Sequence, residues 1–420
     1  MIHLTMDCRL SIIYVVAACL WYCANARDII NSDRYLSSTK CFPSLFAFGD
    51  SKTDTGNEQA YFPYESRSER LPYGSTFFGR PSDRFCDGRL TIDFQAQAYG
   101  LPLLSPYARG LGSDFQHGAN FAVSGSGCIP GVAYSGFHLT RQLNQFKKFR
   151  ASYEDKFVRD KSYISPNEYF GRGLYVISTG ENDYRNGILN MGLTSKEIKS
   201  EMAPKVVNIT YSTVKALYDE GARKFLVVGI AADGCIPKLL TLVPHEDPEG
   251  LDELGCLVSV NDYVQYHNIL LFKAVLRLRT ELSDAQISFG DFFGANVDIF
   301  VNAHKYGFME THLSCCGFGG KYKYNSVVQC GETGEVDGTE VTASSCDNPS
   351  EYINWDGIHL TERFYEFIAL AFLHGYFVDE PVILPSSCSL NFSSFTSYMT
   401  FKKVFGFDRS LNPQVRRTES

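Results

Sequence analysis

Short apolar, β-prone runs recur along this chain with helix-like segments between them, and this alternation leaves few folds open. The runs are 45–49 (LFAFG), 119–123 (ANFAV), 174–179 (LYVIST), 225–230 (FLVVGI) and 287–291 (ISFGD). Helical patterns span 204–219 and 261–282, and Thr361 stands as the N-cap of a last helix. Strands that are apolar on both faces and separated by helices indicate a parallel sheet with helices on both sides. The pattern therefore predicts an α/β fold.

The chain has 420 residues, shows no internal repeat and contains no stretch typical of a linker. We expect a single domain over residues 27–385, because α/β chains often run this long as one unit. A tail of unclear structure, 386–420, follows it. Inside the domain, residues 311–357 are rich in Gly and Cys and lack periodicity. A loop this long is usually functional or disordered, and its four cysteines favour an ordered one.

The N-terminus has the features of a secretory signal peptide. Arg9 precedes the apolar run SIIYVVAACLWYC, and Ala24-Asn25-Ala26 supplies the small residues that a signal peptidase requires. We therefore expect a signal peptide over residues 1–26. The alternative is a membrane anchor, but the apolar run is short for a bilayer span. Because no later segment has 18 apolar residues in a row, we expect no membrane span after cleavage.

The cysteines and the glycosylation sequons agree with secretion. Of thirteen cysteines, three belong to the expected signal peptide. The ten that remain are Cys41, Cys86, Cys128, Cys235, Cys256, Cys315, Cys316, Cys330, Cys346 and Cys388. An even count in a secreted chain favours disulfides, but the spacing does not reveal their pairing. The sequons place the expected glycosylation sites at Asn208 and Asn391.

Charge and motif content argue against two classes of function. The net charge is -8 and no long basic run occurs, which disfavours a nucleic-acid partner. The sequence contains neither a CxxC pair nor an HExxH motif, so no zinc site is expected. We expect no metal and no cofactor.

Polar residues follow the predicted strands where a site would form. The first strand ends in Gly49-Asp50-Ser51, and the second runs into SGSG (124–127). The third ends in GENDY (180–184), and WDGIHLTE (355–362) leads into the last helix. Because the carboxyl ends of parallel strands share one edge of a sheet, we expect these four segments to converge there.

The residues at this edge can supply a serine nucleophile with its partners, namely a base, a group that orients the base, and oxyanion donors. Asp356 and His359 are three residues apart, so one turn can place the carboxylate against Nδ1 and leave Nε2 facing Ser51. Backbone N–H groups near Ser51 and Gly125, and the Asn182 amide, can bind an oxyanion. Each pattern alone is more often structural. Their joint occurrence, in order and at strand ends, indicates a serine hydrolase.

The four segments also resemble the sequence blocks of the plant GDSL esterase/lipase family, within the SGNH hydrolase superfamily. The matching blocks are FAFGDSKTDTGN, GANFAVSGSG, ISTGENDY and WDGIHLTE, with LPYGSTFFGRPSDRFCDGRLTIDF (71–94), GCLVSVNDYVQYHN (255–268) and CCGFGGKYKYN (315–325) between them. The blocks occur in the family's order over residues 43–380. The resemblance implies a three-layer α/β/α, flavodoxin-like hydrolase with a central, mostly five-stranded parallel sheet.

The resemblance also implies roles for individual residues. The nucleophile, base and orienting acid would be Ser51, His359 and Asp356. The oxyanion hole would be the N–H of Ser51, Gly125 and Asn182, and Gly118 is an alternative to Gly125.

One position departs from the family pattern. Lys52 stands where the family has the Leu that gives the motif its name. We expect its side chain to point away from the nucleophile, with little effect on the chemistry, or to alter the entrance to the site. Asp54, Asn57 and Asp183 are expected to brace the turns beside the site rather than to act in catalysis.

The expected function is a secreted serine esterase that hydrolyses short-chain or acetyl esters through an acyl-enzyme. Its substrate would be a small-molecule or polysaccharide ester, met in the apoplast, the cell wall or the vacuole. One alternative is a fucosidase-like glycosidase with Asp50 and Asp356 as its carboxylate pair. Another is a catalytically silent cell-wall protein. The oligomeric state, the natural ester and the role of Lys52 stay open at this point.

Overall fold

The computed structural model describes residues 40–62, 64–245 and 250–406. The signal peptide predicted over 1–26 lies outside the described residues, as does the end of the predicted tail, 407–420. The two sequon asparagines, Asn208 and Asn391, are described and exposed.

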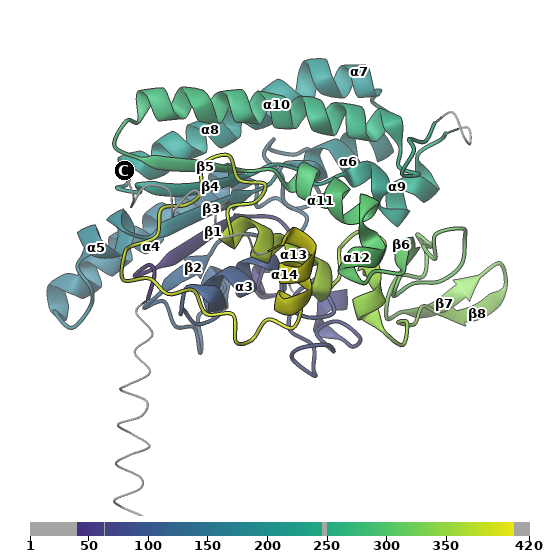
Figure 1. Ribbon diagram of the computed structural model, residues 1–420, viewed down its shortest axis with the longest axis horizontal. Helices are drawn as coiled ribbons and strands as arrows, with labels where there is room; N and C mark the ends of the chain where they lie inside the picture. Colours follow the sequence, from purple (N-terminus) through teal and green to yellow (C-terminus); the bar gives the residue numbers. More distant parts are fainter. Residues whose placement is uncertain (1–39, 63, 246–249, 407–420) are drawn as a thin grey trace, which may run out of the picture.

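A five-stranded sheet forms the centre of the protein (Figure 1). Its strands are β1 (Leu45–Gly49), β2 (Gly118–Asn120), β3 (Leu174–Ser178), β4 (Lys224–Val228) and β5 (Gln286–Gly290). They lie in the order β2-β1-β3-β4-β5, and every neighbouring pair is parallel. This is the flavodoxin-like order, in which the winding direction reverses between β1 and β3. The predicted parallel sheet is confirmed.

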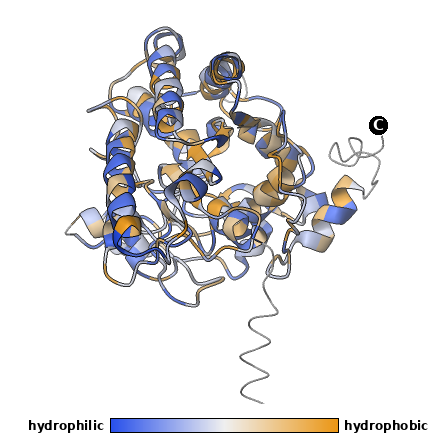
Figure 2. Cartoon of the chain, turned by 90° about the vertical axis from the view of Figure 1, so that its left-hand side faces the viewer, coloured by the Kyte–Doolittle hydropathy of each residue, from blue (hydrophilic) through white to orange (hydrophobic). Residues whose placement is uncertain are grey.

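Alternate side chains of β1, β3 and β4 enter two separate hydrophobic cores. Phe46 and Phe48 of β1 pack in the first core, with α4 (Leu139–Arg159), α8 (Ala203–Asp219) and α10 (Val258–Glu281). Leu45 and Ala47 pack in the second core, with α3 (Thr91–Ala98), α11 (Phe292–Val301) and α13 (Glu362–Leu373). Helices therefore cover both faces of the sheet, and the three-layer α/β/α fold is confirmed. Hydrophobic residues gather in the interior, and the outward sides of the peripheral helices are mostly hydrophilic (Figure 2).

The predicted second strand, 119–123, is wrong at its end. β2 stops at Asn120 because the Asn120 side-chain oxygen accepts the N–H of Ala122, an Asx turn that bends the chain. The N–H groups of Phe121 and Val123 still bond to carbonyls of β1. The chain beyond β2 therefore stays against β1 without continuing the ladder.

The helices predicted at 204–219 and 261–282 form as α8 and α10, with α10 beginning three residues earlier than expected. Thr361 is the N-cap residue of α13, but its hydroxyl donates to the Tyr352 carbonyl instead of accepting from the helix. The Asp87 carboxylate accepts the N–H of Glu362 at that end. Asp87, which is distant in sequence, therefore caps the N-terminus of α13 in place of the Thr361 hydroxyl.

The remaining elements are short. The helices are α2 (Asn57–Tyr61), α5 (Pro166–Gly171), α6 (Glu181–Leu189), α7 (Ser195–Glu197), α9 (Pro237–Leu242), α12 (Ala303–Tyr306) and α14 (Tyr398–Phe405). The 3₁₀ turns are η1 (Arg67–Glu69), η2 (Tyr107–Arg109), η4 (Asp233–Cys235) and η5 (Pro349–Glu351), and η3 (Ile198–Met202) is a π-turn. The further strands are β6 (Glu310–Ser314), β7 (Thr333–Val336), β8 (Thr339–Thr342) and β9 (Tyr352–Asn354).

Disulfides fix the segment 311–357 and the two ends of the described chain. The four pairs are Cys41–Cys388, Cys235–Cys256, Cys315–Cys346 and Cys316–Cys330. Two of them staple 311–357, which also holds the β7–β8 hairpin and β9, so this segment is ordered. Cys86 and Cys128 are free and buried.

The chain after residue 385 packs on the same domain as far as it is described. Cys388 bonds to Cys41, and Phe395 and Phe401 are buried in the core that includes α13. Within the described ranges, no helix combines the length and the apolar character that a bilayer crossing requires.

Candidate active site

The segments predicted to converge do meet at the carboxyl edge of the sheet, beside the β1/β3 switch point. Ser51 follows β1, and Asn182 lies in the first turn of α6 directly after β3. Gly49 ends β1 with φ +149, and a Cβ there would lie 2.0 Å from the Ser178 carbonyl oxygen of β3. Only glycine allows this approach, so Gly49 lets the chain turn sharply into Ser51.

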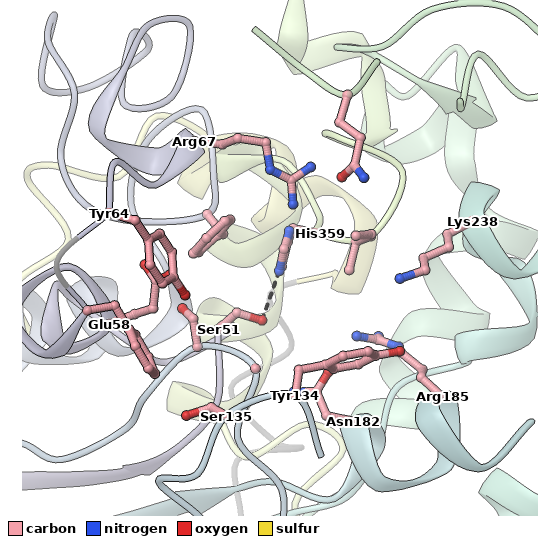
Figure 3. A pocket seen from close by; sticks show the side chains of 16 residues that line it. Ser51, Glu58, Tyr64, Arg67, Tyr134, Ser135, Asn182, Arg185, Lys238 and His359 are labelled. Atoms are coloured by element: carbon pink, nitrogen blue, oxygen red, sulfur yellow. Dashed lines mark hydrogen bonds between the residues drawn. The ribbon is translucent and has the colours of Figure 1, made fainter. Parts of the chain in front are cut away.

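Ser51 lies in a tight turn that brings its hydroxyl to His359. The N–H groups of Thr53 and Asp54 both donate to the Asp50 carbonyl, which closes the turn around Ser51. The Ser51 Oγ lies 2.8 Å from His359 Nε2 (Figure 3). Both residues are buried, although they also line a cavity.

Asp356 holds the other nitrogen of His359. Nδ1 lies 2.8 Å from Oδ2 and 3.0 Å from Oδ1 of this carboxylate, between β9 and α13. The Ile358 and His359 N–H groups donate to Oδ1, and the Tyr73 hydroxyl donates to Oδ2 at 2.8 Å. The carboxylate is therefore fixed in place, and the structure forms a continuous chain from Tyr73 through Asp356 and His359 to Ser51.

Burial and charge set the protonation of this pair. Burial alone would raise the pKa of Asp356, but the His359 charge, its hydrogen bonds and Arg67 together hold that pKa well below its usual range. Burial lowers the pKa of His359 below 6.5, against the opposing effect of Asp356. Asp356 is therefore ionised and His359 neutral near pH 7, the protonation states that a general base and its orienting group require.

The predicted oxyanion donors line the same cavity as Ser51. Gly125 has φ +71, which favours glycine, and Asn182 Nδ2 donates to the Ser126 carbonyl at 2.9 Å. That bond uses one amide hydrogen and leaves the second for a ligand. Within the described part of the chain, the backbone N–H groups of Ser51 and Gly125 have no acceptor. The alternative residue, Gly118, lies in β2, where its N–H donates to the Tyr169 hydroxyl.

Asp54 and Asp183 tie the loops of the site together. The Asp54 carboxylate accepts the N–H groups of Gly56, Asn57, Glu58 and Ser124. Asp183 accepts those of Cys128 and Ile129. Asn57 Nδ2 donates to the Asn120 and Ala122 carbonyls. Each of these side chains joins segments from different strand ends.

Lys52 does not lie at the entrance of the site. It is 5% exposed, and its Nζ lies 2.6 Å from Glu181 Oε1 and 3.6 Å from Asp233 Oδ1. The shorter contact is an ion pair without hydrogen-bond geometry, since Glu181 Oε1 has no hydrogen-bond partner among the described residues. The expectation of an altered entrance is therefore wrong, because buried carboxylates hold the ammonium group inside the protein and Lys52 does not line the cavity.

A cavity of about 290 Å³ opens beside Ser51 and His359. Its walls include residues that the sequence did not point to: Glu58, Phe62, Tyr64, Arg67, Phe85, Tyr134, Arg185, Lys238 and Gln329. Arg185 follows Asn182 by three residues on α6, and this spacing was the available signal for its position. Arg67 lies in η1 and Lys238 in α9, two short elements that follow no predicted strand end and carry no such signal. Among the described residues, no group of His, Cys, Asp and Glu is arranged to hold a metal ion.

Comparison with known proteins agrees with this geometry. The sequence matches the family described as GDSL-like lipase/acylhydrolase over residues 45–372. It is 38% identical over 358 residues to the GDSL esterase/lipase ENOD8 of Medicago truncatula, covering 83% of this chain and 90% of that protein. It is 38% identical over 368 residues to an esterase of Hevea brasiliensis (84% and 91%). It is 35% identical over 337 residues to alpha-L-fucosidase 3 of Arabidopsis thaliana (78% and 89%). The chain therefore belongs to the GDSL-like lipase/acylhydrolase family.

Proposed function

We propose that this carboxylic-ester hydrolase is a secreted serine esterase in which Ser51 is the nucleophile, His359 the general base and Asp356 the group that orients His359. The observation that carries the proposal is the 2.8 Å contact between Ser51 Oγ and His359 Nε2, with Nδ1 held by Asp356. This arrangement matches the roles that a Ser-His-Asp triad requires.

In the first half of the reaction, Ser51 Oγ attacks the ester carbonyl while its proton moves to His359 Nε2. The imidazolium that forms is stabilised by Asp356, whose carboxylate is held by Tyr73 and two backbone N–H groups. The carbonyl oxygen becomes an oxyanion. Its donors are the N–H groups of Ser51 and Gly125 and the second amide hydrogen of Asn182.

The intermediate then collapses to an acyl-enzyme on Ser51, and His359 returns the proton to the departing alcohol. In the second half, His359 takes a proton from water, and the hydroxide attacks the acyl group through the same oxyanion hole. The proton passes back to Ser51 Oγ, and the carboxylic acid leaves. No cofactor is needed for any step.

The size of the cavity supports a small acyl group. Its volume, about 290 Å³, is at the lower end of the range for pockets that bind small molecules. We therefore propose acetyl or other short-chain esters as substrates, on a small molecule or on a polysaccharide whose remaining part stays outside the cavity.

Secretion is proposed from the chain's covalent features. Four disulfides favour an oxidising compartment, and both sequons, at Asn208 and Asn391, are exposed on the described surface. With the signal sequence predicted over 1–26, they support a protein that works in the apoplast, the cell wall or the vacuole. The hydrolase itself would be the single domain predicted over 27–385, together with its tail.

A glycosidase activity fits the site less well. Glycoside hydrolysis by the usual route requires two carboxyl groups that flank the bond. Among the described residues that line the cavity, Glu58 is the only acid. Asp356 is engaged by His359 and Tyr73, and Asp50 does not line the cavity.

The proposal is tested with 4-nitrophenyl acetate, butyrate and palmitate. We expect the wild-type protein to prefer acetate and butyrate, and Ser51→Ala to lose activity on all three esters. Full activity of Ser51→Ala would remove the serine mechanism. A wild-type protein inactive on every ester would favour the silent cell-wall protein, and activity only on 4-nitrophenyl α-L-fucoside would favour the glycosidase.

A further inference from the structure

The cavity beside Ser51 carries more positive charge than ester hydrolysis by the proposed triad uses. Three cationic side chains line it, Arg67, Arg185 and Lys238, and they enter from different segments of the chain (Figure 3). The whole chain has a net charge of -8. The cationic cavity is therefore a local feature of an acidic protein.

Among the described residues, Arg185 is the one of the three cations that forms an ion pair, whereas the Asp356 charge acts on Arg67 and Lys238 without a contact short enough for an ion pair. Arg185 donates two hydrogen bonds of 2.7 Å to the carboxylate of Asp233. Within the described ranges, the Lys238 ammonium makes no hydrogen bond or ion pair, and it faces the Tyr134 ring at 5.5 Å. Arg67 likewise has no ion pair there, and its Nη1 is buried without a hydrogen-bond partner. A buried cationic donor without a partner is costly unless a ligand completes it.

The acid that lines the cavity does not offset this charge fully. Glu58 lies on the other side of Ser51 from Lys238 (Figure 3). Burial raises the pKa of Glu58 to about 7, so this side chain is partly neutral near neutral pH. Burial and the charges of Arg185 and Arg67 lower the pKa of Lys238 to about 8. The cations therefore repel one another, and a bound anion would relieve that repulsion.

We propose that the preferred substrates are esters that carry a carboxylate, which Arg67 and Lys238 bind while Ser51 attacks the ester carbonyl. The proposal rests on the serine esterase mechanism proposed above and names the substrate class of that site. Arg67 offers a planar fork suited to a carboxylate, and Lys238 offers a point charge from another segment of the chain. Cations in a cavity with low-dielectric walls also steer anionic substrates toward it.

A matched pair of acetyl esters tests the proposal. The anionic member is 4-acetoxybenzoate, and the neutral member is methyl 4-acetoxybenzoate. The carboxylate withdraws electron density from the ring less strongly than the methyl ester does. The intrinsic reactivity of the acetyl ester is therefore higher in the neutral compound. We expect the kcat/KM of the wild-type protein to be at least about tenfold higher for 4-acetoxybenzoate than for its methyl ester. A difference of this size is what a hydrogen bond to a charged group contributes. The ratio should fall as salt is added.

Variants assign the preference to the two cations. In Lys238→Met and in Arg67→Met, the ratio of kcat/KM between the anionic and the neutral ester is expected to fall about tenfold. The matched control is Lys196→Met, which removes the same charge from the exposed start of α7 and should keep the wild-type ratio. Thermal melts establish that each variant is folded.

Inhibition of the wild-type protein by the reaction products gives a readout that needs no variant. We expect 4-hydroxybenzoate to inhibit competitively at a concentration at least about tenfold lower than methyl 4-hydroxybenzoate. Hydrolysis of both esters without preference for the anion, or equal inhibition by the two products, would overturn the anionic substrate class and leave the esterase standing. Hydrolysis of neither ester, with no activity on 4-nitrophenyl acetate, would instead count against the esterase itself.

Discussion

Replacing Lys52 by Leu, the residue that the family pattern has there, should destabilise this protein. Lys52 lies in a buried group of charges with Asp50, Glu181, Arg185 and Asp233. Burial and the Glu181 charge raise the pKa of Asp50 well above its usual range, so Asp50 takes up a proton more readily than an ordinary aspartate and adds less negative charge to this group. In Lys52→Leu, two carboxylates would share Arg185 alone.

The size of the expected loss of stability in Lys52→Leu follows from the burial of the Lys52–Glu181 ion pair. The side chains of Lys52 and Glu181 are each 4% exposed, so water screens their interaction little. Breaking a buried ion pair on one side costs about 3–5 kcal/mol. The variant can limit the loss by protonating one carboxylate, and raising a carboxyl pKa by two or three units costs roughly 3–4 kcal/mol near pH 7. With on the order of 0.8 kcal/mol/K of unfolding entropy for a domain of this length, the melting temperature should fall by about 4 °C.

The dependence on pH separates this explanation from a simple loss of packing. The carboxyl that takes up the proton in Lys52→Leu has a higher pKa folded than unfolded, so the variant regains stability as the pH falls. We expect the deficit, measured by urea unfolding, to be largest at pH 7.5 and to shrink by about 1.4 kcal/mol per pH unit below about pH 6.5, where the folded variant binds the proton and the unfolded chain does not. Lys196→Leu is the exposed control and should stay within about 0.5 kcal/mol of wild type. A Lys52→Leu variant as stable as wild type at pH 7.5, or a deficit independent of pH, would refute the reasoning.

Two further predictions concern the chemistry. Asn182→Ala should lower kcat about 10²–10³-fold while Ser51 stays reactive, because one oxyanion donor is lost and the backbone donors remain; steady-state kinetics on 4-nitrophenyl acetate measures this, and a loss below threefold would remove Asn182 from the oxyanion hole. His359 acts as a neutral base whose pKa burial lowers, so kcat/KM should reach half its plateau at a pH below 6.5. A half-maximal point above pH 6.5 would contradict the protonation assigned to His359.

Much of the fold was predictable because the strands are short and apolar on both faces. β1 matches its predicted bounds, and β3, β4 and β5 differ from theirs by one or two residues. The end of β2 was missed because a single Asn side chain bends the chain, which propensity does not register. The polar segments at the strand ends were found because a parallel sheet gathers its carboxyl ends at one edge.

The features that could not be predicted from the sequence depend on contacts between distant segments. Tyr73 and Asp356 are 283 residues apart in the sequence, and no local sequence pattern predicts the hydrogen bond between them. The burial of Lys52 is just as hidden, because lysine is almost never buried unless paired and its partners follow other strands. The even number of cysteines suggested that they pair, but Cys86 and Cys128 are free, since pairing depends on which residues the fold brings together.

The most direct test of the central claim is to trap the acyl-enzyme. The protein is mixed with 4-nitrophenyl acetate, quenched in acid within the first turnover, and analysed by intact-mass and peptide mass spectrometry. We predict one acetyl group on the peptide that contains Ser51 in the wild-type protein. No acetyl group should be detected on that peptide in Ser51→Ala. In a variant with slowed deacylation, the acetylated protein should accumulate. An acetyl group on another residue, or full turnover in Ser51→Ala, would contradict the account.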